Sequence, residues 1–501
     1  MSATIEAAKP ALLVNGTPYE VVMGIECHVE LKTETKMFCG CRNVFGAEPN
    51  TNVCPVCLGM PGALPVPNAK AIALLVKAGL AFDARIPAFS KFDRKNYFYP
   101  DMPKDYQISQ FDMPLTQGGV VHFWLGDGSR GSCRLTRIHL EEDTGKSTHA
   151  SRDGRIAGST HSLVDFNRAG VPLMECVSEP DIRTAAEAVA FLETLKRTFV
   201  ALGISDVKME EGSLRCDVNL SLRPVGQTEY GTKAEIKNMN SFNSVGRAIE
   251  SEIARQVAVL ESGGRIVQET RGWDEAAGVT HTMRSKEQAH DYRYFPDPDL
   301  TPIEFAPADV ARMRAELGVL PDENLTRLIE ADKLRPEQAL QILDSPGLFG
   351  YYAAVVERCA KPQAAVNFVL GDLSRLANET QTPVPESKIT PEALAELVAL
   401  IEAKTINSKT AKELIVRLWH AGGSPRSIVE AEGLAQVSDT GAIDAIVAEV
   451  LAANAKSVDD YRAGKTKVLG FLVGQVMKQS RGTANPTLAE ERLRAHLDAT
   501  G

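Results

Sequence analysis

The sequence predicts an α+β domain around a mainly antiparallel sheet, followed by an all-α helical domain and a small all-α tail domain. Short runs that alternate apolar and polar residues indicate β-strands, and over residues 19–300 they are mixed with helical patterns. The order is not strictly strand–helix–strand, which favours an antiparallel sheet. From about residue 307 the chain is rich in Ala, Leu, Glu and Lys with helical periodicity. A hinge is predicted at Gly422-Gly423-Ser424-Pro425.

These patterns predict the limits of the domains and of their main elements. We expect a leader at 1–18, the α+β domain at 19–300, the helical domain at 301–422 and the tail domain at 425–501. Helices are expected at 184–202 and 241–262, where apolar residues recur on one face, and Gly263-Gly264 ends the second helix. Strands are expected at 120–126, 133–140, 160–167, 214–223 and 232–238.

From Met23 to Leu31, apolar residues alternate with glycine or polar residues. Successive side chains of a strand point to opposite faces, so Glu26, His28 and Glu30 share the polar face. Two carboxylates and an imidazole in a row can hold a divalent cation or move protons. The alternative is an ordinary half-buried strand with its polar face in water, which is the more common cause of such alternation.

The composition places the chain among ordinary globular proteins. Of its 501 residues, 44% are hydrophobic and 24% charged, and no stretch approaches the roughly 18 apolar residues of a membrane span. The segment 1–10 has no apolar signal core, so we expect a cytoplasmic protein that does not contact membranes. A net charge of −10 argues against a protein that coats nucleic acid, although a local basic strip could still dock RNA.

Four of the nine cysteines form two close pairs, Cys39-Gly40-Cys41 and Cys54-Pro55-Val56-Cys57. Two such pairs across a short loop are typical of a structural zinc site with four thiolates, here a knuckle at 39–57. Four free cysteines are the alternative. Four thiolates would close the coordination shell, so this zinc would be structural rather than catalytic.

Carboxylates recur near the ends of the predicted strands, where a few of them could bind Mg²⁺. Taken one at a time, such residues are usually solvated surface groups. They are Glu141, Glu142, Asp143, Glu175, Glu179, Asp181, Glu210, Glu211 and Asp217.

Two basic segments are candidates for nucleic-acid or nucleotide contacts. Residues 90–107 mix cations, aromatic rings and turn residues, which suits phosphates and planar groups, or else a long structured surface loop; no regular core element is expected there. Residues 461–485 are a candidate RNA-backbone site or a solvated helix face, because they lack Asp and Glu. The cations of this second segment are Arg462, Lys465, Lys467, Lys478 and Arg481.

A P-loop is excluded at Thr144-Gly145-Lys146-Ser147-Thr148. The first glycine of that motif would fall at position 140, which is Leu140. No Gly-rich dinucleotide fingerprint is present either.

Long ordered strings of the chain resemble one family. They include Gly24-Ile-Glu-Cys-His-Val-Glu-Leu31, Ser90-Lys-Phe-Asp-Arg-Lys-Asn-Tyr-Phe-Tyr-Pro-Asp101, His139-Leu-Glu-Glu-Asp-Thr-Gly-Lys146, Asp165-Phe-Asn-Arg-Ala-Gly-Val-Pro-Leu-Met-Glu175 and Glu210-Glu-Gly-Ser-Leu-Arg-Cys-Asp217. From about residue 19 onward the chain resembles the B subunit of the bacterial aspartyl/glutamyl-tRNA amidotransferase, the GatB family of the GatCAB complex. The resemblance implies a cradle domain, a helical domain and a tail domain that contacts tRNA.

The resemblance also implies an ATP-dependent carbon–nitrogen ligase. Glutamate on tRNA(Gln), or aspartate on tRNA(Asn), would be phosphorylated by ATP on its side-chain carboxylate, and ammonia would then displace the phosphate to leave the amide. Mg²⁺ would offset charge on the transferring phosphoryl group. The sequence has no amidase-type Gly-Gly-Ser-Ser-Gly segment, so the ammonia would come from the amidase A subunit, in a heterotrimer with the small C subunit.

Carried over by motif, the resemblance implies His28, Glu142 and Glu175 as Mg²⁺ ligands. Glu26 would hold metal, position ammonia or act as a general base, whereas no role follows for Glu30. Lys95 and Lys104 fall in the motif along the family's ammonia path. The four cysteines match the zinc-bearing branch of the family.

Two other functions remain open at this point. A small-molecule kinase or amide ligase could use the same Mg²⁺ site, and a zinc-bearing scaffold could bind RNA without any chemistry.

Overall fold

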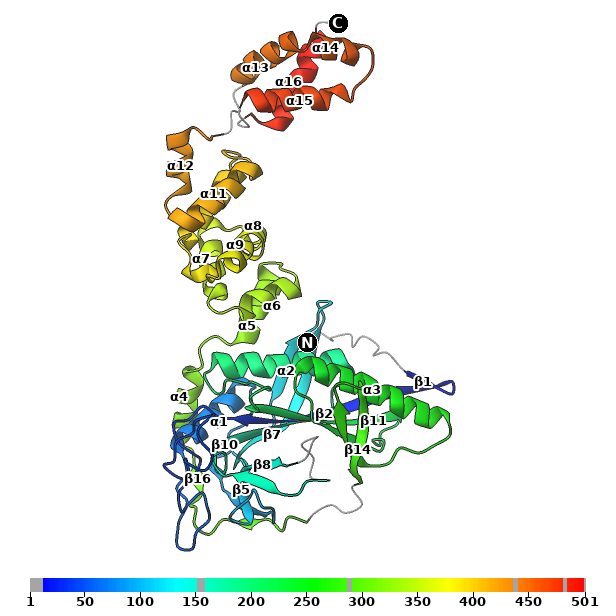
Figure 1. Ribbon diagram of the computed structural model, residues 1–501, viewed down its shortest axis with the longest axis vertical. Coiled ribbons are helices and arrows are strands. Elements are labelled where there is room, and N and C mark those ends of the chain that lie inside the picture. The colour runs from blue at the N-terminus through cyan, green and yellow to red at the C-terminus, as the bar shows by residue number, and fades with distance from the viewer. Residues whose placement is uncertain (1–11, 151–157, 286–290, 436–439, 481–483, 500–501) are drawn as a thin grey trace. The chain divides into compact units, whose positions relative to one another are not determined.

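The computed structural model describes residues 12–150, 158–285, 291–435, 440–480 and 484–499 (Figure 1). The chain divides into two compact units, Met1–Asn324 and Leu325–Gly501. The finer domain limits at 300 and 422 stay a prediction. Within the described residues, every helix is too short or too polar to span a membrane.

The first unit is built on a nine-stranded sheet, in the order β14-β13-β12-β11-β2-β10-β7-β6, with β1 paired to β2. All neighbouring strands are antiparallel except β12 and β13, which are parallel, so the predicted fold class is confirmed. The strands are β1 (Leu12–Val14), β2 (Thr17–Glu30), β6 (Val120–Trp124), β7 (Arg130–Glu142), β10 (Pro172–Ser178), β11 (Leu214–Pro224), β12 (Ala234–Lys237), β13 (Glu269–Asp274) and β14 (Val279–Ser285).

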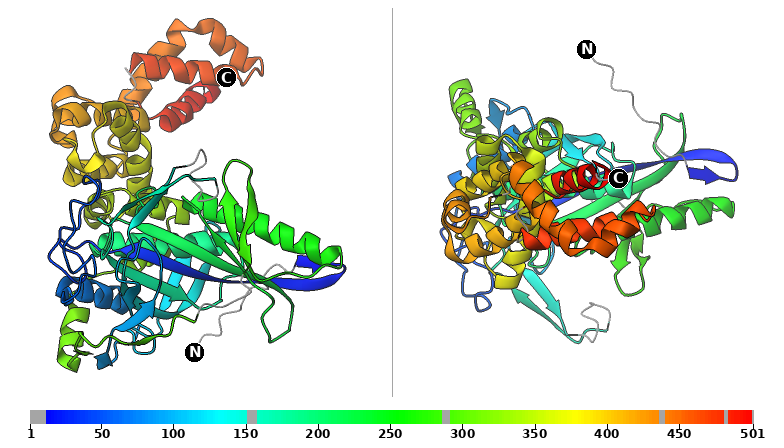
Figure 2. Two further views of the ribbon diagram at one scale, coloured as in Figure 1. Left: turned by 60° about the horizontal axis from the view of Figure 1, so that its bottom comes forward. Right: turned by 90° about the horizontal axis from the view of Figure 1, so that it is seen from above.

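Strand β2 lies at the centre of this sheet (Figure 2). Its alternation is a burial pattern, as predicted. Met23, Ile25, Cys27 and Val29 are almost completely buried in the core, while Glu26, His28 and Glu30 remain partly exposed on the other face. Because β2 is central, β10 pairs with one of its edges and β11 with the other. Both neighbours therefore place side chains beside those of β2 on each face of the sheet.

Three helices cover the core face of the sheet, with α2 and α3 lying along it in Figure 1. Two begin where predicted, since the hydroxyls of Thr184 and Ser241 accept the backbone N–H groups of Glu187 and Ser244. The first of the three was not predicted from the sequence. The helices are α1 (Ala69–Ala81), α2 (Ala185–Ala201) and α3 (Phe242–Glu261).

Small sheets lie beside the main one, and they correct the expectation for residues 90–107. That segment contains two paired strands with buried side chains at Asp93 and Gln107, rather than surface loop alone. The strands include the cations Arg94 and Lys95 and the ring of Tyr106. The pairs are β15 (Phe295–Pro296) with β4 (Asp93–Asn96), β4 with β5 (Tyr106–Ser109), β16 (Ile303–Glu304) with β3 (Phe89–Ser90), and β8 (Lys146–His149) with β9 (Ser162–Asp165).

The expected leader at 1–18 differs from the structure where it is described. Residues 12–18 form β1 and the start of β2, because Leu12–Val14 pairs with Thr17–Tyr19 across a tight turn. Residues 1–11 lie outside the described residues.

The second unit is helical wherever it is described, and the helical pattern from residue 307 is confirmed. Around its last helices a separate apolar cluster forms, with Ile443, Val447, Leu472 and Leu493 fully buried. From residue 307 onward the helical segments are α4 (Pro307–Ala315), α5 (Pro321–Thr326), η1 (Arg327–Ala331), α6 (Pro336–Asp344), α7 (Leu348–Cys359), α8 (Pro362–Asn367), η2 (Phe368–Leu373), α9 (Ser374–Thr380), η3 (Val384–Glu386), α10 (Pro391–Glu402), α11 (Ser408–Ala421), α12 (Pro425–Glu432), α13 (Thr440–Ala453), α14 (Ala455–Arg462), α15 (Val468–Gln479) and α16 (Pro486–Ala499).

Candidate active site and cysteine cluster

The polar face of the sheet carries a row of ionisable side chains across three adjacent strands. His28 of β2 lies opposite Glu175 of β10, and Glu175 lies opposite His139 of β7. Opposite residues in paired strands place their side chains side by side on one face. The row therefore depends on strand register and not on sequence proximity.

His28, Glu141 and Glu175 form the tightest group on this face. The Nε2 atom of His28 lies 3.8 Å from a carboxylate oxygen of Glu141 and 3.7 Å from one of Glu175. One ligand atom from each residue lies within 4.8 Å of the others, a separation that one metal ion could bridge. His139 completes the surroundings, with Nε2 3.1 Å from a carboxylate oxygen of Glu175. These four side chains can bind a cation and orient its ligands.

Glu142 is not part of this group, although it was predicted alongside His28 and Glu175. It follows Glu141 on β7, so its side chain points to the opposite face, where it is 2% exposed. There its carboxylate pairs with the ammonium of Lys104 and accepts the backbone N–H of Ile108 at 3.0 Å. The structure thus joins two predicted residues, Glu142 and Lys104, in a buried ion pair.

Sequence reasoning named Glu141 only as one of many candidate carboxylates, selected Glu142 by motif, and did not single out His139. The alternation that was used for Met23–Leu31 also holds at the end of β7, where Ile138 and Leu140 are buried in the core. Applied there, it places His139 and Glu141 together on the polar face and Glu142 on the other.

Charge–charge interactions keep Glu175 ionised. Burial alone would raise the pKa of its carboxyl group, but the neighbouring His139, His28 and Lys95 hold that pKa well below its usual range. A carboxylate that stays ionised is a suitable cation ligand.

Lys95 of β4 lies beside the same group. Burial would lower the pKa of its ammonium, yet the net shift is upward because Glu141 and Glu175 favour the charged form. Its Nζ atom also lies 4.8 Å from the centre of the Tyr292 ring, within cation–π distance. Lys95 therefore brings a positive charge to the edge of the candidate cation site.

Glu26 belongs to a second acidic group, with Asp217 of β11 and Glu235 of β12. Burial raises the pKa of Glu26, and the charges of Glu175, Asp217 and Glu235 raise it further. Lys237 pairs with Asp217 and, at 3.3 Å, with Glu235, and Asn219 donates to Glu26 at 3.0 Å. The carboxyl group of Glu26 is therefore easier to protonate than that of an exposed glutamate.

Glu30 lies at the far end of the β2 row. Burial raises its pKa to about 7, with a further contribution from the charge of nearby Asp143. Asp143 itself accepts a hydrogen bond from the Arg215 guanidinium at 2.6 Å. At this end of the row, the positive charge of Arg215 therefore balances the two neighbouring carboxyl groups of Glu30 and Asp143.

The four clustered cysteines converge, as their spacing predicted. One Sγ atom from each of Cys39, Cys41, Cys54 and Cys57 lies within 4.8 Å of the others. The Cys54 backbone N–H donates to the Cys57 sulfur at 3.1 Å. A hydrogen bond from Cys39, that N–H group and the charge of Lys36 lower the pKa of Cys57 to about 4 against the opposing effect of burial. Four converging soft donors, one of them readily ionised, suit Zn²⁺.

The basic residues of the tail are exposed where they are described. Lys465 forms an ion pair with Asp460 at 2.8 Å, so part of its charge is balanced within the tail. Arg462 ends α14, and Lys467 and Lys478 lie at the start and end of α15. Arg481 lies outside the described residues.

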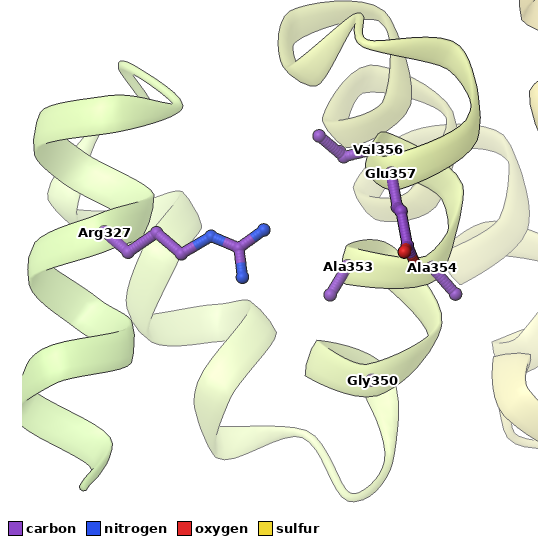
Figure 3. Close-up of a pocket in the computed structure, with 6 residues that line it drawn as sticks. All are labelled: Arg327, Gly350, Ala353, Ala354, Val356 and Glu357. Atoms are coloured by element: carbon purple, nitrogen blue, oxygen red, sulfur yellow. The ribbon is translucent and has the colours of Figure 1, made fainter. Parts of the chain in front are cut away.

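A groove in the second unit contains none of the predicted site residues. Arg327 of η1 extends across it towards the small residues Gly350, Ala353 and Ala354 of α7 (Figure 3). Val356 and Glu357 complete its lining. No cluster of ionisable groups comparable to that of the polar sheet face surrounds it among these six residues.

Two family models match the chain. The GatB/GatE catalytic domain matches residues 21–311, which include most of the sheet and its polar face, and the GatB domain matches residues 350–497. The first match lies in the first compact unit and the second match in the second unit.

Similar proteins cover almost the same length. The chain is 50% identical over 479 residues to the B subunit of the aspartyl/glutamyl-tRNA(Asn/Gln) amidotransferase of Carboxydothermus hydrogenoformans, over 96% of this chain and 99% of that protein. It is 51% identical to the protein of the same name from Moorella thermoacetica, over 96% of this chain and 100% of that protein. For the protein from Acaryochloris marina the identity is 49%, over 96% and 98%. The chain therefore belongs to the family of B subunits of the aspartyl/glutamyl-tRNA(Asn/Gln) amidotransferase.

Proposed function

We propose that this chain phosphorylates and then amidates the amino acid of misacylated tRNA. The γ-phosphoryl group of ATP passes to the side-chain carboxylate of Glu-tRNA(Gln) or Asp-tRNA(Asn), which releases ADP. Ammonia attacks the resulting acyl phosphate, inorganic phosphate leaves, and the amide forms. The observation that carries the proposal is the full-length family match together with the group of His28, Glu141 and Glu175 on the matched domain.

His28, Glu141 and Glu175 would hold Mg²⁺ in this proposal. Glu141 takes the place that the sequence motif suggested for Glu142, because Glu141 shares the polar face with His28 and Glu142 is paired with Lys104. When bound, Mg²⁺ offsets charge on the transferring phosphoryl group and on the substrate carboxylate. His139 orients Glu175 through its 3.1 Å contact, and Glu175 in turn stays ionised.

Glu26 is the group we assign to the proton of the attacking ammonia. A nitrogen that bonds to the acyl carbon must lose a proton, and a carboxylate whose pKa is raised accepts it more readily. Lys95, with its ammonium near Glu141 and Glu175, and Lys104, paired with Glu142, would border the path by which ammonia arrives.

The ammonia would come from a partner, an amidase A subunit that acts together with a small C subunit. The relatives are themselves named as one subunit of an amidotransferase, which implies an assembly of several chains. The four cysteines would hold a structural Zn²⁺, which the chemistry of four converging thiols supports.

The proposal is tested by ADP release from the assembled subunits. With ATP, Mg²⁺, ammonium and Glu-tRNA(Gln) or Asp-tRNA(Asn), we expect ADP and amidated aminoacyl-tRNA in equal amounts, because each amide requires one acyl phosphate. The correctly charged Gln-tRNA(Gln) is the control, and it should give no ADP. ADP formed with free glutamate would favour a small-molecule kinase instead, and no ADP under any condition would favour an RNA-binding scaffold.

The tail should contribute to tRNA affinity through its lysines. The double variant Lys465→Glu/Lys467→Glu should weaken tRNA binding about tenfold at moderate salt, because it replaces attraction to phosphates by repulsion. The slope of log affinity against log salt should also fall by about one for each phosphate that the tail no longer neutralises. Filter binding over a salt series measures both.

A matched charge reversal elsewhere separates a local effect from one of net charge. Lys409→Glu/Lys412→Glu changes two exposed lysines of α11 and should leave tRNA affinity within about twofold. Equal losses of tRNA affinity in the two double variants would show that the tail lysines are ordinary surface residues and do not contact tRNA.

A further inference from the structure

Lys36 is a fully buried lysine beside the cysteine cluster. Its side chain is 0% exposed, and its ammonium donates to the carbonyl oxygen of Phe166 at 3.1 Å. Its other contact is the Cys57 sulfur, at 3.7 Å. Within the described ranges, no Asp or Glu lies at ion-pair distance from its Nζ atom. A buried ammonium without a counter-charge costs several kcal/mol, so the surroundings of Lys36 must supply negative charge.

The cysteine cluster is the group beside Lys36 that can supply this charge. Four thiolates around a divalent cation carry a net negative charge, and one of their sulfurs, Cys57, is the atom that the ammonium approaches. The burial of Lys36 is thus explained when the cluster holds a metal.

Lys36 also connects the cluster to the segment that leads into β10. The Phe166 carbonyl that it binds lies at one end of this segment, and the backbone N–H of Met37 donates to Gly170 at the other end at 2.7 Å. From the loop between the cysteine pairs, the backbone N–H of Asn52 donates to Asn167 at 2.8 Å. The segment 166–171 is therefore fastened to the cysteine loop just before the strand that carries Glu175.

Two glycines show how closely the cysteine cluster packs against the Glu142–Lys104 pair. At Gly170, with φ of +86°, an added Cβ would lie 3.5 Å from the Cys57 Cβ and 3.7 Å from a carboxylate oxygen of Glu142. At Gly59, which follows the second cysteine pair, an added Cβ would lie only 2.6 Å from the Lys104 side chain. Gly170 thus lies beside both Cys57 and Glu142, and the turn after the second cysteine pair packs against Lys104.

We propose that Lys36 is a positioning residue that neutralises the metal-loaded cysteine cluster and ties it to segment 166–171. Through that tie, an occupied cluster holds β10 and the Glu142–Lys104 pair in place. The inference rests on the proposed zinc site and on the proposed amidation, to which it adds a role for Lys36.

The first test is the rate at which zinc leaves the purified assembly. Zinc release to a colorimetric chelator should be about 10- to 100-fold faster in Lys36→Met than in the unmodified protein, as for other residues that support metal ligands from outside the coordination shell. Lys36→Arg keeps the charge and should stay within about threefold of the unmodified protein. Lys32→Met removes an exposed lysine four positions earlier and should release zinc at the unmodified rate.

Hydrogen exchange tests the tie to segment 166–171, first in the unmodified protein. Chelation of zinc from this protein should increase the exchange of the Gly170 and Val171 amides, which lie in the segment and donate to the carbonyl oxygens of Asp143 and Arg168. Lys36→Met should show the same increase before chelation, and Lys36→Arg should not.

These outcomes separate the inference from the function on which it rests. A protein that holds zinc but releases it equally fast in Lys36→Met, or keeps its exchange pattern after chelation, would overturn the role of Lys36 alone. An unmodified protein that holds zinc but makes no amide would overturn the proposed function. The zinc-release and hydrogen-exchange measurements would still test the role of Lys36 in that case. A protein without bound metal would overturn the zinc site and this inference together.

Discussion

Glu141→Gln should lower the rate of ammonia-dependent amidation about 10³-fold, whereas Glu142→Gln should not change the requirement for Mg²⁺. The amide of glutamine removes a negative ligand from the group formed with His28 and Glu175, and stabilisation of a phosphoryl transition state depends on such charges. In Glu142→Gln the polar face is intact, and the change falls on the buried contact with Lys104.

The measurement is amidation of Glu-tRNA(Gln) over a range of Mg²⁺ concentrations, with ammonium as the nitrogen donor. In Glu141→Gln the Mg²⁺ concentration for half-maximal rate should rise together with the loss of rate. In Glu142→Gln that concentration should stay within about twofold, and thermal stability should fall instead, because Lys104 loses a buried partner. The reverse pattern, with Mg²⁺ affinity lost in Glu142→Gln, would assign the cation to the other face of β7.

Glu252→Ala should destabilise the first unit by about 3–5 kcal/mol. Glu252 of α3 is fully buried and accepts hydrogen bonds from Arg255 at 2.6 Å and from Thr280 of β14 at 2.9 Å. It also lies 3.2 Å from the guanidinium of Arg271 on β13. Alanine would leave this arginine, which is nearly buried, without one of its two acidic partners.

Equilibrium unfolding in urea, followed by the fluorescence of Trp273 and Trp124 in the first unit, measures the loss. Glu250→Ala removes an exposed carboxylate from the same helix and should change stability by less than about 0.5 kcal/mol. If both variants unfold at the same urea concentration, the buried contacts of Glu252 are not what joins α3 to the β13–β14 edge of the sheet.

Local patterns in the sequence determined a large part of this protein. The alternation from Met23 to Leu31 predicted which side of β2 is buried, because a strand alternates its faces whatever it pairs with. The beginnings of α2 and α3 follow from Thr184 and Ser241, which cap the first turn with their own hydroxyls. The spacing of the cysteines predicted their convergence, since a short loop brings its two ends together.

The tertiary structure decided which of these residues meet. The register of β10 against β2 and β7 places Glu175 beside both His28 and His139, and a shift of one residue would turn Glu175 to the other face. The contacts of His139 with Glu175 and of Lys36 with Phe166 join positions 36 and 130 residues apart, so no local period contains them. Sequence thus determined the face of each strand and the ends of each helix, because both depend on neighbouring residues. The composition of the site was decided by strand pairing, which only the folded chain defines.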